Sequence, residues 1–181
     1  MRDNKPVSVC RLRRSSGNTL LEAVFTLLPL FAIITGFFDV SFALFSWNTL
    51  QNAVRMGCRY AVTFQTSGAL GQDASIAQIV VQNSMGLLSS STAIDSSSPT
   101  QLSITTNYFT QESPNTAIAA PNGNVPGNIV QVTVVNYPLQ WMIPISGTLA
   151  NPYRSQSPAT INLYAMDVLG GYPVGASSVT R

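Results

Sequence analysis

The chain has 181 residues, a length that allows one domain or one domain with a membrane anchor. Only 9% of its residues are charged, against roughly 25% in an average soluble domain, and 45% are apolar. The formal net charge of +2 comes from the N-terminus, because five bases and one acid precede Gly17 whereas four bases and six acids follow it. The bases flank an apolar segment and do not form a patch on a folded surface, so the composition argues against a nucleic-acid partner.

Residues 18–47 predict a transmembrane helix. The sixteen residues from Ala23 to Phe38 carry no charge, and with the two leucines before Glu22 they approach the roughly 20 residues that cross a bilayer. Since the bases precede this run, the positive-inside rule makes residues 1–17 a basic cytoplasmic leader. Residues 48–181 are then an extracytoplasmic helix followed by a polar head.

A cleaved secretory signal is the competing interpretation of the same segment, because a basic region followed by an apolar region is also typical of signal peptides. Here the apolar core is too long for a signal peptide and contains Glu22 at its start. The best candidate for a cleavage site with small residues, at positions 41–43, is weak. We therefore expect the apolar helix to remain in the protein.

The two cysteines lie on opposite sides of the apolar segment, Cys10 before it and Cys58 after it. A disulfide requires Cα atoms within about 7 Å of each other, and a membrane separates these two. We expect no bridge between them. Cys58 stands among small and apolar residues, which predicts a buried and unreactive thiol.

A second helical pattern continues the apolar segment from Trp47 to about Phe64. Apolar and small residues recur there at steps of three and four, which is the pattern of an amphipathic helix packed on one face. The sequence predicts a single helix from Thr19 to about Phe64, on the order of 70 Å long. The packed face comprises Leu50, Val54, Gly57, Cys58, Ala61 and Val62, and the opposite face comprises Gln51, Asn52, Arg55 and Arg59.

Gly17 and Glu22 stand out at the start of this helix. Gly17 has no side chain, so a protease at the membrane surface can approach its backbone closely. Thr19 and Glu22 match the capping box T-x-x-E, in which both residues bond to the first turn of a helix. Capping explains Glu22, whose charge also suits the helix dipole. It does not explain why a glycine, Gly17, lies five residues before Glu22 and directly after a basic leader.

The rest of the chain predicts a small α+β head. Its core is a small antiparallel sheet of about three strands, packed on the outer half of the long helix. The predicted elements are a helix at 74–88, a polar loop at 89–100, a strand at 101–108, a long loop at 111–128, and strands at 128–141 and 158–168.

The stretch from residue 15 to 62 resembles the TadE-like family. That family combines a glutamate at the helix start, an apolar run with a proline, and a glycine and an acid near its outer end. An asparagine-rich turn and an R-x-G-x-R-Y-A helix follow. These features correspond here to Glu22, Pro29, Gly36, Asp39, Asn48 to Asn52, and Arg55 to Ala61. Ala23 departs from the pattern, because an aromatic residue often follows the glutamate. Cys58 also departs from it, because another small or polar residue is usual there.

The resemblance implies a pilin-like fold. It also implies the function of a minor pilin (pseudopilin) of the tight-adherence, Flp-type type IV pilus. In such proteins a prepilin peptidase cuts after the glycine, here Gly17, and leaves Asn18 as the new N-terminus. Glu22 then meets the N-terminal amine of a neighbouring subunit. The implied partners are this peptidase, other pilins, the inner-membrane assembly platform and membrane lipid. The implied location is the bacterial inner membrane or the pilus, with the head periplasmic or extracellular.

Other interpretations remain for the individual residues and for the head. Asp39 is either solvated at the outer membrane interface or a partner contact, and Arg55 and Arg59 either form a solvated face or pair with acids of a neighbour. The sequence has no histidine and no clustered carboxylates, so we expect no enzyme, no cofactor and no metal site. The alternative functions are an uncleaved single-pass membrane protein with a partner-binding periplasmic head, and an adhesive tip that uses the loops at 89–100 and 111–128.

Overall fold

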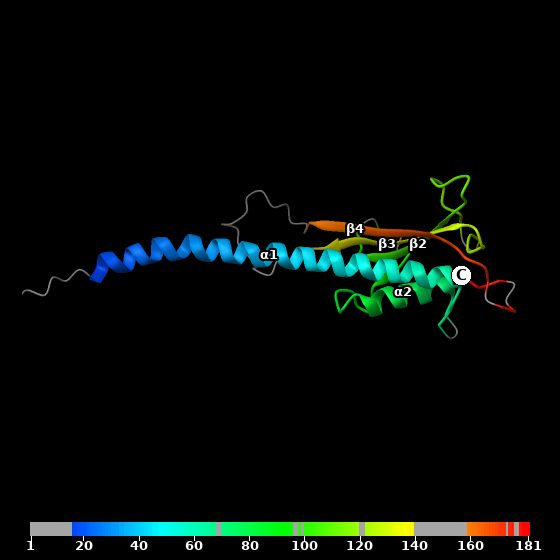
Figure 1. Cartoon of the computed structure of the whole chain (residues 1–181), viewed down its shortest axis with the longest axis horizontal. Coiled ribbons are helices and arrows are strands. Elements are labelled where there is room, and N and C mark those ends of the chain that lie inside the picture. Colours follow the sequence, from blue (N-terminus) through cyan, green and yellow to red (C-terminus); the bar gives the residue numbers. More distant parts are fainter. Residues whose placement is uncertain are drawn as a thin grey trace, which may run out of the picture. The chain divides into compact units, whose positions relative to one another are not determined.

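The structure is a computed structural model that describes residues 16–67, 70–95, 98, 100–119, 122–139, 159–172, 174–175 and 178–181 (Figure 1). The chain divides into two compact units, Met1–Phe38 and Asp39–Arg181. The α+β class predicted from sequence is confirmed, with a long N-terminal helix and a small sheet. The sheet has four strands, where about three were expected.

Helix α1 runs from Ser16 to Val62, close to the predicted bounds. It ends where Phe64 adopts a positive φ of 52°, a conformation that a helix cannot continue through. Within the second unit, the predicted packed face is buried: Leu50 and Val54 are 0% exposed and Cys58 is 2% exposed. On the opposite face, Asn52, Arg55 and Arg59 are exposed, whereas Gln51 is half-buried.

The sheet has the order β1-β2-β3-β4. Strands β2, β3 and β4 are antiparallel neighbours and confirm the three predicted strands, while β1 pairs with β2 in parallel. The prediction of a continuous loop at 89–100 is therefore wrong at β1. Two residues are too few to show an alternating pattern, so only pairing with a distant segment reveals this strand. The strands are β1 Ala93–Ile94, β2 Ser103–Phe109, β3 Ile129–Pro138 and β4 Thr160–Val168.

Helix α2, Gln72–Asn83, is shorter than the predicted 74–88 at its C-terminal end. The helix stops because the Ser84 side chain bonds the Val81 carbonyl at 2.7 Å and because Met85 and Gly86 both have positive φ. Figure 1 shows α2 beside the C-terminal part of α1.

The three layers of the head meet at Gly57 of α1. A Cβ atom on this glycine would lie 2.6 Å from Val80 of α2 and 3.6 Å from Val132 of β3. Because only a glycine fits this close approach, Gly57 sets the distance between α1, α2 and the sheet. The inward face of β3, formed by Val130, Val132 and Val134, is 0% exposed and completes the core.

The loop at 111–128 contains no helix or strand in its described residues 111–119 and 122–128, as predicted. It is nevertheless fixed at its base. Gln111 donates to the Gly127 carbonyl at 2.8 Å, and Asn128 donates to the Gly123 carbonyl at 2.8 Å. These bonds hold the two ends of the loop beside the sheet.

Candidate functional site: the exposed N-terminal half of helix α1

The part of α1 in the first unit is apolar on all sides and exposed. The exposed fractions range from 41% at Ile34 to 74% at Phe25. In water this surface would cost about 25 cal/mol per Å² of apolar area, so it needs a cover of lipid or of other apolar helices. The large apolar residues involved are Leu20, Leu21, Val24, Phe25, Leu27, Leu28, Leu30, Phe31, Ile33, Ile34, Phe37 and Phe38.

The polar groups of this segment are suited to an apolar environment. The Thr26 hydroxyl donates to the Glu22 carbonyl and the Thr35 hydroxyl donates to the Ala32 carbonyl, both at 3.0 Å. Each hydroxyl therefore has a partner within its own helix and needs no water. Among the described residues, one helix, Thr19–Val62, is long and apolar enough to cross a membrane, and its most apolar stretch is 0% buried.

Glu22 is the one charged residue between Ser16 and Phe38, and it is exposed. Helix α1 already begins at Ser16, so Gly17 and Asn18 lie in its first turn and Thr19 lies inside the helix. The capping-box interpretation is therefore wrong for the uncut chain, because Thr19 is not the residue before the helix. Glu22 follows Asn18 by four residues, which is about one helical turn or 6 Å along the axis.

The other predicted site residues lie in the second unit. Asp39 is half-buried and makes an interaction of its own within the chain. Arg55 and Arg59 are exposed. Within the described residues the ion pair found is Arg181–Asp73, and neither Arg55 nor Arg59 takes part in it. The structure brings none of these three residues into a common site, and their roles as partner contacts stay predictions.

The Cys58 thiol is buried against the sheet. It is 2% exposed and lies 3.1 Å from the Ala165 carbonyl, to which it donates. Burial raises the pKa of the Cys58 thiol to about 11. The thiol therefore stays protonated at neutral pH and is a poor nucleophile, which confirms the expectation of a buried, unreactive cysteine. Cys10 lies outside the described residues.

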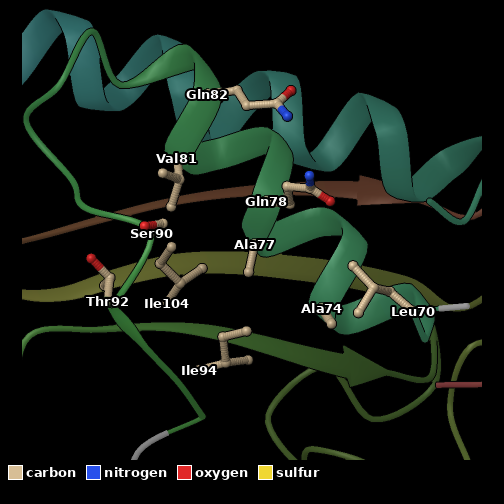
Figure 2. A pocket seen from close by; sticks show the side chains of 10 residues that line it. All are labelled: Leu70, Ala74, Ala77, Gln78, Val81, Gln82, Ser90, Thr92, Ile94 and Ile104. Carbon is tan, nitrogen blue, oxygen red and sulfur yellow. The ribbon is translucent and has the colours of Figure 1, made fainter. Parts of the chain in front are cut away.

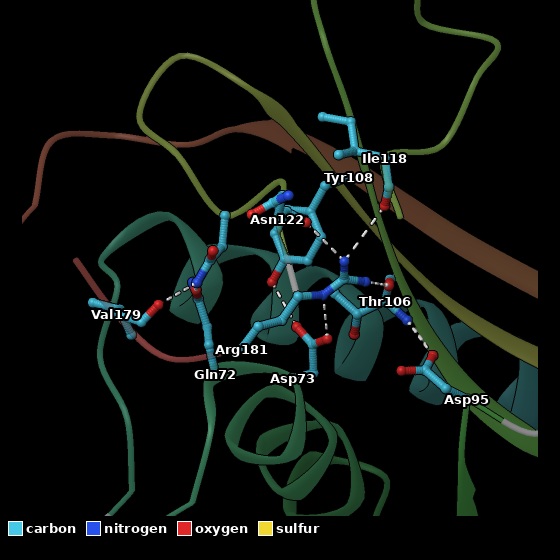
Figure 3. A network of polar contacts seen from close by, with 10 residues as sticks. Gln72, Asp73, Asp95, Thr106, Tyr108, Ile118, Asn122, Val179 and Arg181 are labelled. Atoms are coloured by element: carbon cyan, nitrogen blue, oxygen red, sulfur yellow. Dashed lines mark hydrogen bonds and ion pairs between the residues drawn. The ribbon is translucent and has the colours of Figure 1, made fainter. Parts of the chain in front are cut away.

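A polar network in the head was missed by sequence reasoning (Figure 3). Asp73 of α2 accepts a 2.7 Å bond from the Arg181 guanidinium and a 2.7 Å bond from the Tyr108 hydroxyl. Arg181 also donates to the carbonyls of Thr106 and Asn122 at 3.1 and 2.9 Å. Its guanidinium carbon lies 4.5 Å from the centre of the Tyr108 ring.

This network joins α2, β2 and the loop at 111–128. Burial raises the pKa of Tyr108, so its hydroxyl remains a donor to Asp73 at all ordinary pH values. Asp73 and Arg181 are 108 positions apart, and no local pattern marks either of them. We interpret the network as structural, because each of its charges has a partner and it contains no unpaired nucleophile or base.

The described part of the chain also contains no group of three metal-ligating side chains. Within the described residues, the candidate functional site is therefore the exposed half of α1, with Glu22 near its start.

Comparison with known proteins bears on this helix. The family model described as TadE-like protein matches residues 17–59, from the glycine before the apolar run to the second arginine beyond it. The match confirms the TadE-like resemblance drawn from the helix sequence, and it ends within α1, before α2 and the sheet. No curated protein and no solved structure matches the chain.

Proposed function

We propose that this chain, which carries a TadE-like helix at residues 17–59, is a minor pilin (pseudopilin) of a tight-adherence, Flp-type type IV pilus. The observation that carries the proposal is the exposed apolar half of α1 with a single carboxylate near its start. Such a helix needs an apolar cover, and the membrane and then the filament supply it in turn. The head stays outside the membrane and supports adhesion and surface attachment.

The leader is the signal for processing in this proposal. Residues 1–17 hold the N-terminus in the cytoplasm through their bases. A prepilin peptidase cuts after Gly17, and the cut removes five bases and one acid together with Cys10. The product begins at Asn18 with a new ammonium group at the membrane surface.

Glu22 is the assembly residue in this proposal. A carboxylate inside the membrane is costly, by about 2.5 to 3.5 kcal/mol at the centre and less near the ends. Pairing with the Asn18 ammonium group of a neighbouring subunit removes that cost, because opposite charges attract strongly where water is excluded. Glu22 lies about one turn beyond Asn18, so such a pair forms when neighbouring helices are displaced by about 6 Å along their axes.

N-terminal sequencing of the membrane-bound protein tests the processing step. In cells that make a prepilin peptidase the sequence should begin at Asn18. In cells without the peptidase it should begin at Met1. The matched control is Gly17→Val, which should block the cut, since the branched side chain prevents close approach to the backbone. An intact Met1 in the presence of the peptidase would remove the basis of the pilin proposal.

The alternative function is an uncleaved single-pass membrane protein with a partner-binding head. A groove in the head favours keeping this alternative, because it is large enough for a ligand and is unrelated to α1 processing. The same sequencing experiment separates the two functions.

A further inference from the structure

A groove runs between helix α2 and the edge of the sheet at β1 (Figure 2). Its volume is about 410 Å³, within the roughly 300–1,000 Å³ of typical ligand pockets. Ala74, Ala77 and Val81 form the wall on α2, and Ile104 and Ile94 form the side on the sheet. All of these residues belong to the second unit, so the groove is a feature of the head alone.

Within the described residues, the β1 side of the groove is an open sheet edge. Ile94 pairs with Ile104 in the parallel ladder, and the Asp95 N–H donates to the Ile104 carbonyl at 3.0 Å. Ile104 therefore directs its hydrogen-bonding groups toward β1, whereas Ile94 turns its own N–H and C=O away from β2. No further strand follows β1 in the described sheet. Such an edge is a template for another strand.

The groove is uncharged. None of the side chains that line it is an acid or a base, and two apolar residues at its rim, Leu70 and Ile94, are each 46% exposed. Burying a charge among these side chains would be costly, since none of them carries an opposite charge. The amides of Gln78 and Gln82 supply donors and acceptors along the α2 wall. The lining thus complements an apolar or neutral segment and disfavours a charged one.

We propose that this groove binds an extended, uncharged peptide segment of a partner protein, which adds to the sheet as a strand beside β1. Its backbone pairs with the N–H and C=O of Ile94, and alternate apolar side chains enter the groove between Ile94 and Val81 of α2. This mode of recognition takes its affinity from main-chain hydrogen bonds and its specificity from the side-chain pocket. The site does not involve Gly17 or Glu22, so the inference stands apart from the proposed pilin function.

Selection from a random heptapeptide library on the full chain in lipid nanodiscs tests the inference. The peptides enriched should be uncharged, with apolar residues at alternate positions. Two sets of synthetic copies carry N-methyl groups on the odd-numbered or on the even-numbered amides, because alternate N–H groups of a strand point to opposite sides. The set methylated on the side that faces β1 should bind about tenfold more weakly or worse than the other set, as expected for the loss of one or more hydrogen bonds. No enrichment, enrichment of charged peptides, or equal binding of the methylated copies would overturn the inference.

Two variants locate the binding. Ile94→Pro removes the outward N–H without removing a bond between β1 and β2, and Ala74→Phe fills the groove at a half-buried position. Both should weaken binding of the selected peptides about tenfold or more. Ile79→Phe, on α2 but outside the groove lining, is the matched control and should bind as the original chain does.

Binding of both groove variants at full strength would show that the peptides bind elsewhere and would overturn the assignment. A different outcome is self-association of the chain that Ile94→Pro abolishes, without any enriched peptide. That result would show that a second copy of the chain binds in the groove, and it would overturn the inference of a separate partner protein.

Discussion

The two parts of helix α1 use apolar residues in opposite ways. In the first unit Leu28 is 66% exposed and Phe25 is 74% exposed, whereas in the second unit Leu50 and Val54 are 0% exposed. The second part is covered by α2 and the sheet of its own chain. For the first part the described residues supply no cover, so lipid or other helices must provide it. An apolar sequence thus predicts that a surface is covered. The structure shows whether the chain's own elements provide that cover.

The largest expected effect comes from truncating a leucine in each part. Leu50→Ala should lower the free energy of unfolding of the head by about 3 kcal/mol, because it opens a cavity in a closed core. Leu28→Ala should leave that free energy unchanged, since Leu28 lies in the other unit. Urea unfolding of the full chain in detergent micelles, followed by near-UV circular dichroism, measures both. Similar losses for the two variants would contradict the division of α1.

A smaller effect is expected at two glycines of the same helix. Gly57→Ala should destabilise the head by about 2 kcal/mol, since its Cβ would lie 2.6 Å from Val80 and would force α1 away from α2. Gly36→Ala is the matched control, because its Cβ would have no neighbour within 4 Å. The same unfolding measurement applies. A neutral Gly57→Ala would show that the α1–α2 contact is looser than described.

The smallest effect is a pH dependence from Cys58. Its thiol loses a proton near pH 9 in the unfolded chain and near pH 11 in the head. Between these values the unfolded state binds fewer protons, so the free energy of unfolding should fall with rising pH, by about 1 kcal/mol per pH unit. Burial also raises the pKa of Tyr108 and of Tyr137, which adds a fall of the same sign at higher pH.

Unfolding at pH 7.5, 9 and 10 in a Cys10→Ser background measures this dependence. The background leaves Cys58 as the one cysteine. In Cys58→Ala the fall between pH 9 and 10 should be much shallower, although the variant is less stable at every pH because of its cavity. An unchanged slope in Cys58→Ala would assign the dependence to the tyrosines.

Local patterns in the sequence predicted most of the fold. The three- and four-residue spacing from Leu50 to Val62 predicted the buried face of α1, and the alternation of Val130, Val132 and Val134 predicted β3. Strand β1 was missed because two residues carry no period and pair only with a distant segment. The Arg181 network was missed because its partners are scattered along the chain and meet only in the folded head.

The roles of the candidate site residues stay predictions, and the structure adds only where they lie on α1. Glu22, behind Gly17 and ahead of an uncharged run, stands out in the sequence alone. The expectation that Thr19 caps the helix failed because α1 begins at Ser16. Sequence spacing marks a helix start to within a few residues, and a cap requires the exact position.

The proposed role of Glu22 is to join the processed helix to a pilus. The most direct measurement compares the original chain with Glu22→Ala in sheared pili and in membranes, by immunoblot and N-terminal sequencing. The original chain should appear in the pilus fraction and should begin at Asn18. Glu22→Ala should also begin at Asn18 but should stay in the membrane. Pili that contain Glu22→Ala at the original level would contradict the assembly role of Glu22.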